Sequence, residues 1–269
     1  MRAVGRVQRD RAGCCDSFDA VVVHGVGRHE TETRVAMLVV VPVEEIAAVR
    51  ASVLNATEAL GDRTRARTAL EASVALCREI GARYPEGYGL LGLGRLADEE
   101  GDAALALQLT QESLDVRRSM GHGEGIADTL IELGDLRARA GNEDAARKAL
   151  DESVALSRDQ GRKAQVALAQ ALLACLPGGD ADAALAALGD LDEHGDSPRL
   201  RWLLFRATGD RAHLEEAKRL LDESLANVPE EYHESMLTNL RVNREIMAAW
   251  KTEFGDGDVP SEAETVVAD

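Results

Sequence analysis

The sequence predicts an all-α fold, an α-solenoid of about five helical hairpins followed by a C-terminal capping helix. The first observation is a register of 40 residues, in which a glycine precedes a helix-capping residue at Gly61-Asp62, Gly101-Asp102 and Gly141-Asn142. The second is that an alanine and a serine recur at fixed distances after each glycine: Ala66, Ala106 and Ala146; Ser73, Ser113 and Ser153. The third is composition, since 45% of the residues are apolar and only 3% are aromatic, which suits closely packed Ala/Leu-rich helices. A fixed period of this length is typical of stacked supersecondary units.

The segment before the repeats, residues 1–42, does not share the register. It begins with several arginines and continues with two β-branched runs, Val21–Val23 and Val39–Val41. We expect a non-repeat leader here, either weakly ordered or forming one or two short strands.

The repeat region is expected over residues 43–250, with a flexible acidic tail over 251–269. Its units are predicted at 44–81, 84–121, 124–161, 163–192 and 196–229, with the cap at 230–250. Within a unit, glycine ends the first helix in the left-handed conformation, and the next residue caps the second helix. The polar face of the cap is expected to end the array without exposing apolar surface; it consists of Glu231, Glu234, Arg241, Arg244 and Glu245.

Two glycines in the middle of predicted helices, Gly94 and Gly134, have a packing explanation. Glycine inside a helix costs about 1 kcal/mol relative to alanine. This cost is reasonable where a neighbouring helix comes too close for a Cβ atom. We expect Ala106 and Ala146 of the second helices to face these glycines.

These residues resemble the tetratricopeptide repeat family, in the 40-residue form of kinesin light chains and bacterial regulators. The resemblance rests on Leu93-Gly94, Ala97, Gly101-Asp102, Ala106 and Leu114, and on the copy Leu133-Gly134, Gly141-Asn142, Ala146 and Val154. It implies a right-handed solenoid that binds a protein or peptide in its concave groove and has no catalytic activity. The chain departs from the family at Leu172 and Trp202, which replace mid-helix glycines, and at Leu90 and Leu130, which replace aromatics.

The ending of the chain, residues 228–250, is similar to the extreme C-termini of long bacterial signalling proteins. In those proteins the repeats follow a serine/threonine kinase or ATPase module. The resemblance therefore implies an alternative, in which this chain is the sensor or regulatory fragment of such a protein and a kinase or ATPase module is its partner.

The family geometry implies which residues line the groove. The candidate groove residues are Asn55, Arg95, Asp98, Glu99, Asp128, Asp135 and Arg139. This mixed but acid-leaning set would favour a peptide partner with some basic residues. The alternative is that these charges form only a solvated helix face.

The sequence gives little support for catalytic chemistry, and we expect that the protein is not an enzyme. The segment around His24-Gly25 is similar to the oxyanion turn of α/β-hydrolases, but the G-x-S-x-G nucleophile elbow does not occur in the chain, so hydrolase activity is a remote alternative. The glycines of Gly92–Gly94 and Gly121–Gly125 do not follow predicted strands, and the chain has no G-x-x-x-x-G-K-[ST] motif. We interpret them as parts of helices and turns.

Composition limits the remaining partners. The net charge of −17 disfavours nucleic acid and anionic membranes. The longest apolar stretch, Val35–Val43, is too short to span a bilayer. The four cysteines lack the spacing of a zinc site and are sparse enough to favour the cytoplasm. No cofactor or metal is therefore expected.

Overall fold

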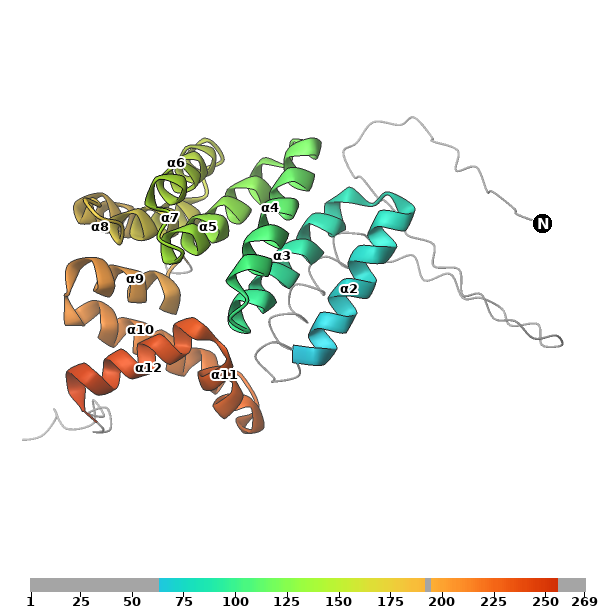
Figure 1. Cartoon of the computed structure of the whole chain (residues 1–269). Helices are drawn as coiled ribbons and strands as arrows, with labels where there is room; N and C mark the ends of the chain where they lie inside the picture. Colours follow the sequence, from blue (N-terminus) through green and yellow to red (C-terminus); the bar gives the residue numbers. More distant parts are fainter. Residues whose placement is uncertain (1–62, 192–194, 256–269) are drawn as a thin grey trace, which may run out of the picture. The chain divides into compact units, whose positions relative to one another are not determined.

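The computed structural model describes residues 63–191 and 195–255, all of which belong to the compact unit Ala51–Asp269. The predictions for the leader at 1–42, for the first helix of the first unit and for Asn55 lie outside the described residues. Within the described ranges every regular element is helical, and the helices pack in consecutive contacts (Figure 1). The prediction of an all-α fold is confirmed at this level.

Helices alternate with short turns along the whole described part of the chain. The first six are α2 (Arg63–Ile80), α3 (Arg83–Glu99), α4 (Ala103–Met120), α5 (Gly123–Arg139), α6 (Glu143–Asp159) and α7 (Lys163–Ala174). They are followed by α8 (Ala181–Gly189), α9 (Pro198–Thr208), α10 (Arg211–Ala226), the 3-10 helix η1 (Glu230–Tyr232), α11 (His233–Asn239) and α12 (Arg241–Phe254).

The turns between α2 and α7 repeat every 20 residues. A glycine with φ between 67° and 85° stands at Gly81, Gly101, Gly121, Gly141 and Gly161. The left-handed region costs glycine little, so these residues end the helices with small steric strain. The predicted caps are confirmed at two of these turns, where Asp102 accepts from the Leu105 N–H at 3.0 Å and Asn142 accepts from the Ala145 N–H at 3.4 Å.

The mid-helix glycines lie where two helices approach closely. A Cβ atom at Gly94 would stand 2.6 Å from Thr110 Oγ1 and 3.4 Å from the carbonyl oxygen of Ala106. A Cβ atom at Gly134 would stand 2.6 Å from the side chain of Leu150. The close approach is therefore confirmed at both glycines, although a leucine rather than the predicted alanine fills the notch at Gly134.

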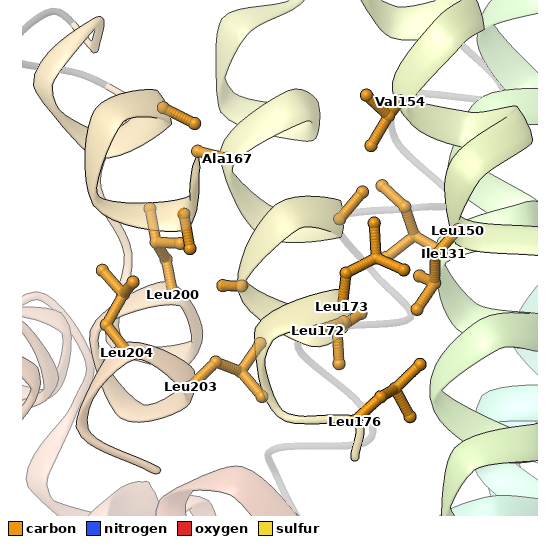
Figure 2. Close-up of a cluster of buried hydrophobic side chains, with 14 of the residues drawn as sticks. Ile131, Leu150, Val154, Ala167, Leu172, Leu173, Leu176, Leu200, Leu203 and Leu204 are labelled. Carbon is orange, nitrogen blue, oxygen red and sulfur yellow. The ribbon is translucent and has the colours of Figure 1, made fainter. Parts of the chain in front are cut away.

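The largest hydrophobic cluster extends from α5 to α9 (Figure 2). Its buried side chains include Ile131, Leu150, Val154, Leu172, Leu173, Leu200, Leu203 and Leu204. A second cluster joins α9, α10 and α12 and is built around Trp202, Leu214, Leu221 and Ile246. Leu172 and Trp202, which replace the mid-helix glycines, are thus core residues.

The prediction of one capping helix over 230–250 is wrong. The chain there forms η1, α11 and α12, and Leu240 between the last two has extended backbone angles, φ −89° and ψ 121°. The physical reason is that both oxygens of the Glu99 carboxylate accept from the Arg241 N–H, at 3.0 and 2.8 Å, so α12 begins at Arg241. The helix continues to Phe254, and residues 251–254 of the predicted tail are helical.

No helix in the described part of the chain has both the length and the apolar composition needed to cross a bilayer.

Candidate functional site

Four carboxylates on the first helices of two neighbouring hairpins form the candidate site, which we name the acidic cluster: Asp98 and Glu99 of α3, and Glu132 and Asp135 of α5. Glu132 and Asp135 are three residues apart and so share one face of α5. Asp98 and Glu99 lie in the last turn of α3. Each of the four is mostly buried and contacts at least one arginine.

Arginine 199, near the start of α9, binds the α5 half of the cluster. Its Nη1 atom lies 2.9 and 3.1 Å from the two oxygens of Glu132, and its Nη2 atom lies 3.2 Å from Asp135 Oδ2. Arg95 of α3 adds a bond to Glu132 Oε1 at 2.6 Å. Glu132 thus accepts from two guanidinium groups, one of them more than 60 residues away in the sequence.

Arginine 241, the first residue of α12, connects the two halves of the cluster. Its Nη2 atom donates to Asp135 Oδ2 at 2.8 Å, and its Nε atom lies 3.8 Å from Asp98 Oδ2. Its backbone N–H donates to Glu99, as described above. Glu99 therefore satisfies the first amide of α12 and places a negative charge at the positive end of that helix, a favourable arrangement.

Two further arginines complete the network. Arg139 donates to Asp98 Oδ2 at 2.7 Å, and its Nε atom lies 3.6 Å from Asp135 Oδ1. Arg244 of α12 lies 3.5 Å from Glu99 Oε2. It also donates to the backbone oxygens of Thr238 and Asn239 at 2.7 Å, which holds the end of α11 beside the same cluster.

The pKa values of the two glutamates of the cluster shift in opposite directions. Burial alone would raise the pKa of Glu132, but Arg199 and Arg95 outweigh burial and hold this pKa well below its ordinary value. Burial raises the pKa of Glu99 above its ordinary value, although the Arg241 N–H, Arg244 and the Arg241 side chain oppose the shift. Glu132 and Asp135 in turn raise the pKa of Arg199, against the effect of burial. The site therefore keeps Glu132 and Arg199 firmly charged.

Most of the predicted groove residues meet in this cluster. Arg95, Asp98, Glu99, Asp135 and Arg139 are brought together, whereas Asp128 is bound elsewhere. The Asp128 carboxylate accepts from Arg162 Nη2 at 2.9 Å. Of the residues expected on the polar face of the cap, Arg241 is instead mostly buried in the acidic cluster, whereas Arg244 contacts Glu99 and remains exposed.

Sequence reasoning missed Glu132, Arg199, Arg241 and Arg244 as members of this site. Glu132 could have been found, because it lies one helical turn before Asp135 on the same face. The arginines of α9 and α12 could not, since nothing in the 40-residue register indicates which distant helix reaches α3 and α5.

The chemistry of the arrangement is that of charge pairing within the chain. Carboxylates that are acceptors when ionised face planar guanidinium groups, the pairing that gives strong charge-assisted hydrogen bonds. Within residues 63–191 and 195–255 no group of three or more His, Cys, Asp or Glu side chains is placed to hold a metal ion. No protein-family model and no curated protein matches this chain.

Proposed function

We propose that this protein is a non-catalytic binding module that recognises an arginine-bearing segment of a partner protein through its acidic cluster. One observation carries the proposal: carboxylates of α3 and α5 bind arginines presented by distant helices, with Arg199 of α9 and Arg241 of α12 as the main donors. A surface that already binds arginines 64 to 145 residues away in the sequence has the chemistry to bind such residues from another chain.

In this proposal α12 occupies the acidic cluster in the absence of a partner. A partner segment that carries arginines on a helix would compete with Arg241 and Arg244 for the same carboxylates. Its binding would therefore displace α12, and the apparent affinity would be reduced by the stability of the intramolecular contact.

We further infer that the hairpins form a right-handed solenoid of the tetratricopeptide type. The 40-residue register supports this, since Ser113 donates to the Gly87 carbonyl at 2.7 Å and Ser153 donates to the Ala127 carbonyl at 2.9 Å. Each bond spans 26 positions within one hairpin, and the second bond lies 40 positions after the first, so successive hairpins are joined internally in the same way. The assignment to the cytoplasm stays a prediction that rests on the sparse cysteines.

The test uses the full chain and a labelled peptide of residues 230–255 as the arginine-bearing probe. An Arg241→Ala/Arg244→Ala protein, which we call the vacated protein because the two α12 arginines are absent from the cluster while Arg199 remains, should bind the peptide at least about tenfold tighter than the wild type does, which corresponds to about 1.4 kcal/mol. Fluorescence anisotropy gives the two dissociation constants.

Two controls decide whether the acidic cluster is responsible. Adding Asp135→Asn to the vacated protein should weaken peptide binding several-fold, whereas adding Asp151→Asn on the exposed side of α6 should not. A peptide in which both arginines are replaced by alanine should lose most of its affinity. Equal binding of the two peptides would refute the proposed recognition of arginine.

A further inference from the structure

Arg117, in the last turn of α4, is the largest side chain that is completely enclosed, with 0% exposure. Its three guanidinium nitrogens, Nε, Nη1 and Nη2, have no hydrogen-bond partner among the described residues. A guanidinium group has five N–H donors and remains charged, so its burial without acceptors is strongly unfavourable. These unused N–H donors point to a hydrogen-bond acceptor that the described residues do not supply.

The repeat itself shows that the fold does not need an arginine at this position. The residues 40 positions before and after Arg117 are Cys77 and Ser157, and both are buried. The same place in the neighbouring hairpins is therefore filled by a small side chain. Arg117 is a departure from the repeat that costs solvation energy and gains no ion pair in return.

Two glycines make the space that the guanidinium occupies. A Cβ atom at Gly125 would collide with Arg117 Nη1, and a Cβ atom at Gly87 would stand 3.0 Å from Arg117 Cγ. The register-equivalent residues of Gly125 are Pro85 and Gln165, and those of Gly87 are Ala127 and Ala167. Gly87 precedes Arg117 in the same hairpin and Gly125 begins the next one, and neither register position holds glycine in the other hairpins, so the arginine and the space around it belong together.

The surroundings of the guanidinium are largely aromatic. Its Cζ atom lies 4.1 Å from the ring centroid of Tyr88, and the Tyr84 ring lies 4.9 Å from the His122 ring. His122 stands at the N-terminus of the 17-residue helix α5 without capping it, and its buried Nδ1 atom has no hydrogen-bond partner in the described part of the chain. Because a Cβ atom at Gly125 would collide with this Nδ1 atom as well as with Arg117 Nη1, both groups face the first turn of α5.

We propose that Arg117, His122 and the first turn of α5 form a binding site for the carboxylate of a small molecule. The unpartnered guanidinium can donate two parallel hydrogen bonds to a carboxylate, and the helix N-terminus favours a negative charge there. Tyr84, Tyr88 and His122 are partly exposed while Arg117 is enclosed, so binding requires these aromatic side chains to rotate and admit the ligand.

The charge of the surroundings selects a singly charged ligand. Glu124 lies in the first turn of α5, and Asp128 follows one turn later, where its charge is balanced by Arg162. A dianion such as phosphate would meet the uncompensated charge of Glu124, whereas a monocarboxylate brings one negative charge to one unpaired guanidinium. The site is separate from the acidic cluster and does not depend on the proposed function.

The test measures the melting temperature of the full chain in acetate, in inorganic phosphate and in chloride at equal ionic strength. At about tenfold excess over the dissociation constant, acetate should raise the melting temperature of the wild type by about 3 °C over chloride. Isothermal titration calorimetry with acetate should show the corresponding heat. Arg117→Met should abolish both responses, and Arg118→Met, which removes an exposed arginine paired with Glu152, should abolish neither.

A second variant keeps the test decisive if Arg117→Met fails to fold. Gly125→Ala places a methyl group against Nη1 and should also remove the acetate response. An equal response of Arg117→Met or Gly125→Ala and wild type, or no acetate response of the wild type, would overturn the proposal. A larger response to phosphate than to acetate would overturn the assignment of the ligand as a carboxylate.

Discussion

Two arginines of this protein, one partly buried and one completely enclosed, have opposite surroundings. Arg199 lies in the acidic cluster, where the carboxylates of Glu132 and Asp135 accept three hydrogen bonds from it. Arg117 lies between α3, α4 and α5, where a tyrosine ring covers it and no described residue accepts a hydrogen bond from it. The difference teaches that burial alone does not reveal what an arginine does. What matters is whether the guanidinium N–H groups have hydrogen-bond acceptors within the chain: with acceptors the arginine stabilises the fold, and without them it can bind a ligand.

The largest effect is expected where the paired arginine is removed. Arg199→Met leaves Glu132 and Asp135 mostly buried with fewer donors, so the free energy of unfolding should fall by about 3 kcal/mol. Urea denaturation followed by circular dichroism measures this change. Arg211→Met removes an exposed arginine that pairs with Glu253 and should cost less than about 1 kcal/mol. Equal losses in the two variants would show that the acidic cluster does not stabilise the fold.

The unpaired arginine should behave in the opposite way. In buffer without carboxylates, Arg117→Met replaces an enclosed charge by an apolar side chain of similar length, so the free energy of unfolding should rise by about 1 to 2 kcal/mol. The same urea titration measures it, with Arg118→Met as the matched exposed control. A loss of more than about 2 kcal/mol would instead mean that the contact with Tyr88 makes Arg117 a stabilising residue.

Removal of the carboxylate that begins α12 should have a smaller and more local effect. Glu99→Ala takes away both acceptors of the Arg241 N–H, and the loss of a capping acceptor typically costs about 1 kcal/mol. Amide hydrogen exchange should become faster in α12 and remain unchanged in α6. Uniformly faster exchange in both helices would indicate global destabilisation and contradict the assignment of Glu99 as a cap.

The sequence predicted the features that depend on residues close to each other in the register. Gly101-Asp102 and Gly141-Asn142 end and begin helices through local backbone geometry and a local hydrogen bond, so their roles could be assigned from the sequence. The break at Leu240 could not, because the amide that begins α12 is bound by Glu99, 142 residues earlier.

The same distinction between local and distant residues applies to the acidic cluster and to the Arg117 site. Asp98, Glu99 and Asp135 of the acidic cluster were among the groove residues that the family resemblance implied, and Glu132 was missed, while Arg199 and Arg241 depend on how distant helices pack. Arg117 did leave a signal, since it replaces a small residue found 40 positions away on either side, at Cys77 and Ser157. This replacement can be interpreted as a binding site only when the burial of Arg117 and its lack of hydrogen-bond partners among the described residues are known.

The smallest expected effect is on the titration of His122. Burial lowers the pKa of His122, and the positive charge of Arg117 lowers it further, while Glu124 and Asp128 oppose the shift and Arg162 adds to it. Since the folded pKa lies below the value of about 6.5 for an unfolded chain, the unfolded state takes up the proton first, and stability falls as the pH drops from about 7 through that value.

Arg117→Met should therefore raise the pKa of His122 toward its ordinary value and reduce the loss of stability between about pH 7 and pH 5. Proton NMR of the histidine ring resonances follows the titration directly. His213 is the internal control, because burial and Arg201 lower its pKa and no contact joins it to Arg117 among those described. A change at His122 without a change at His213 would place the charge of Arg117 beside the imidazole, as a binding site made of both groups requires. If neither histidine responds, the two groups do not share a site, and Arg117 and Arg199 differ in pairing without differing in function.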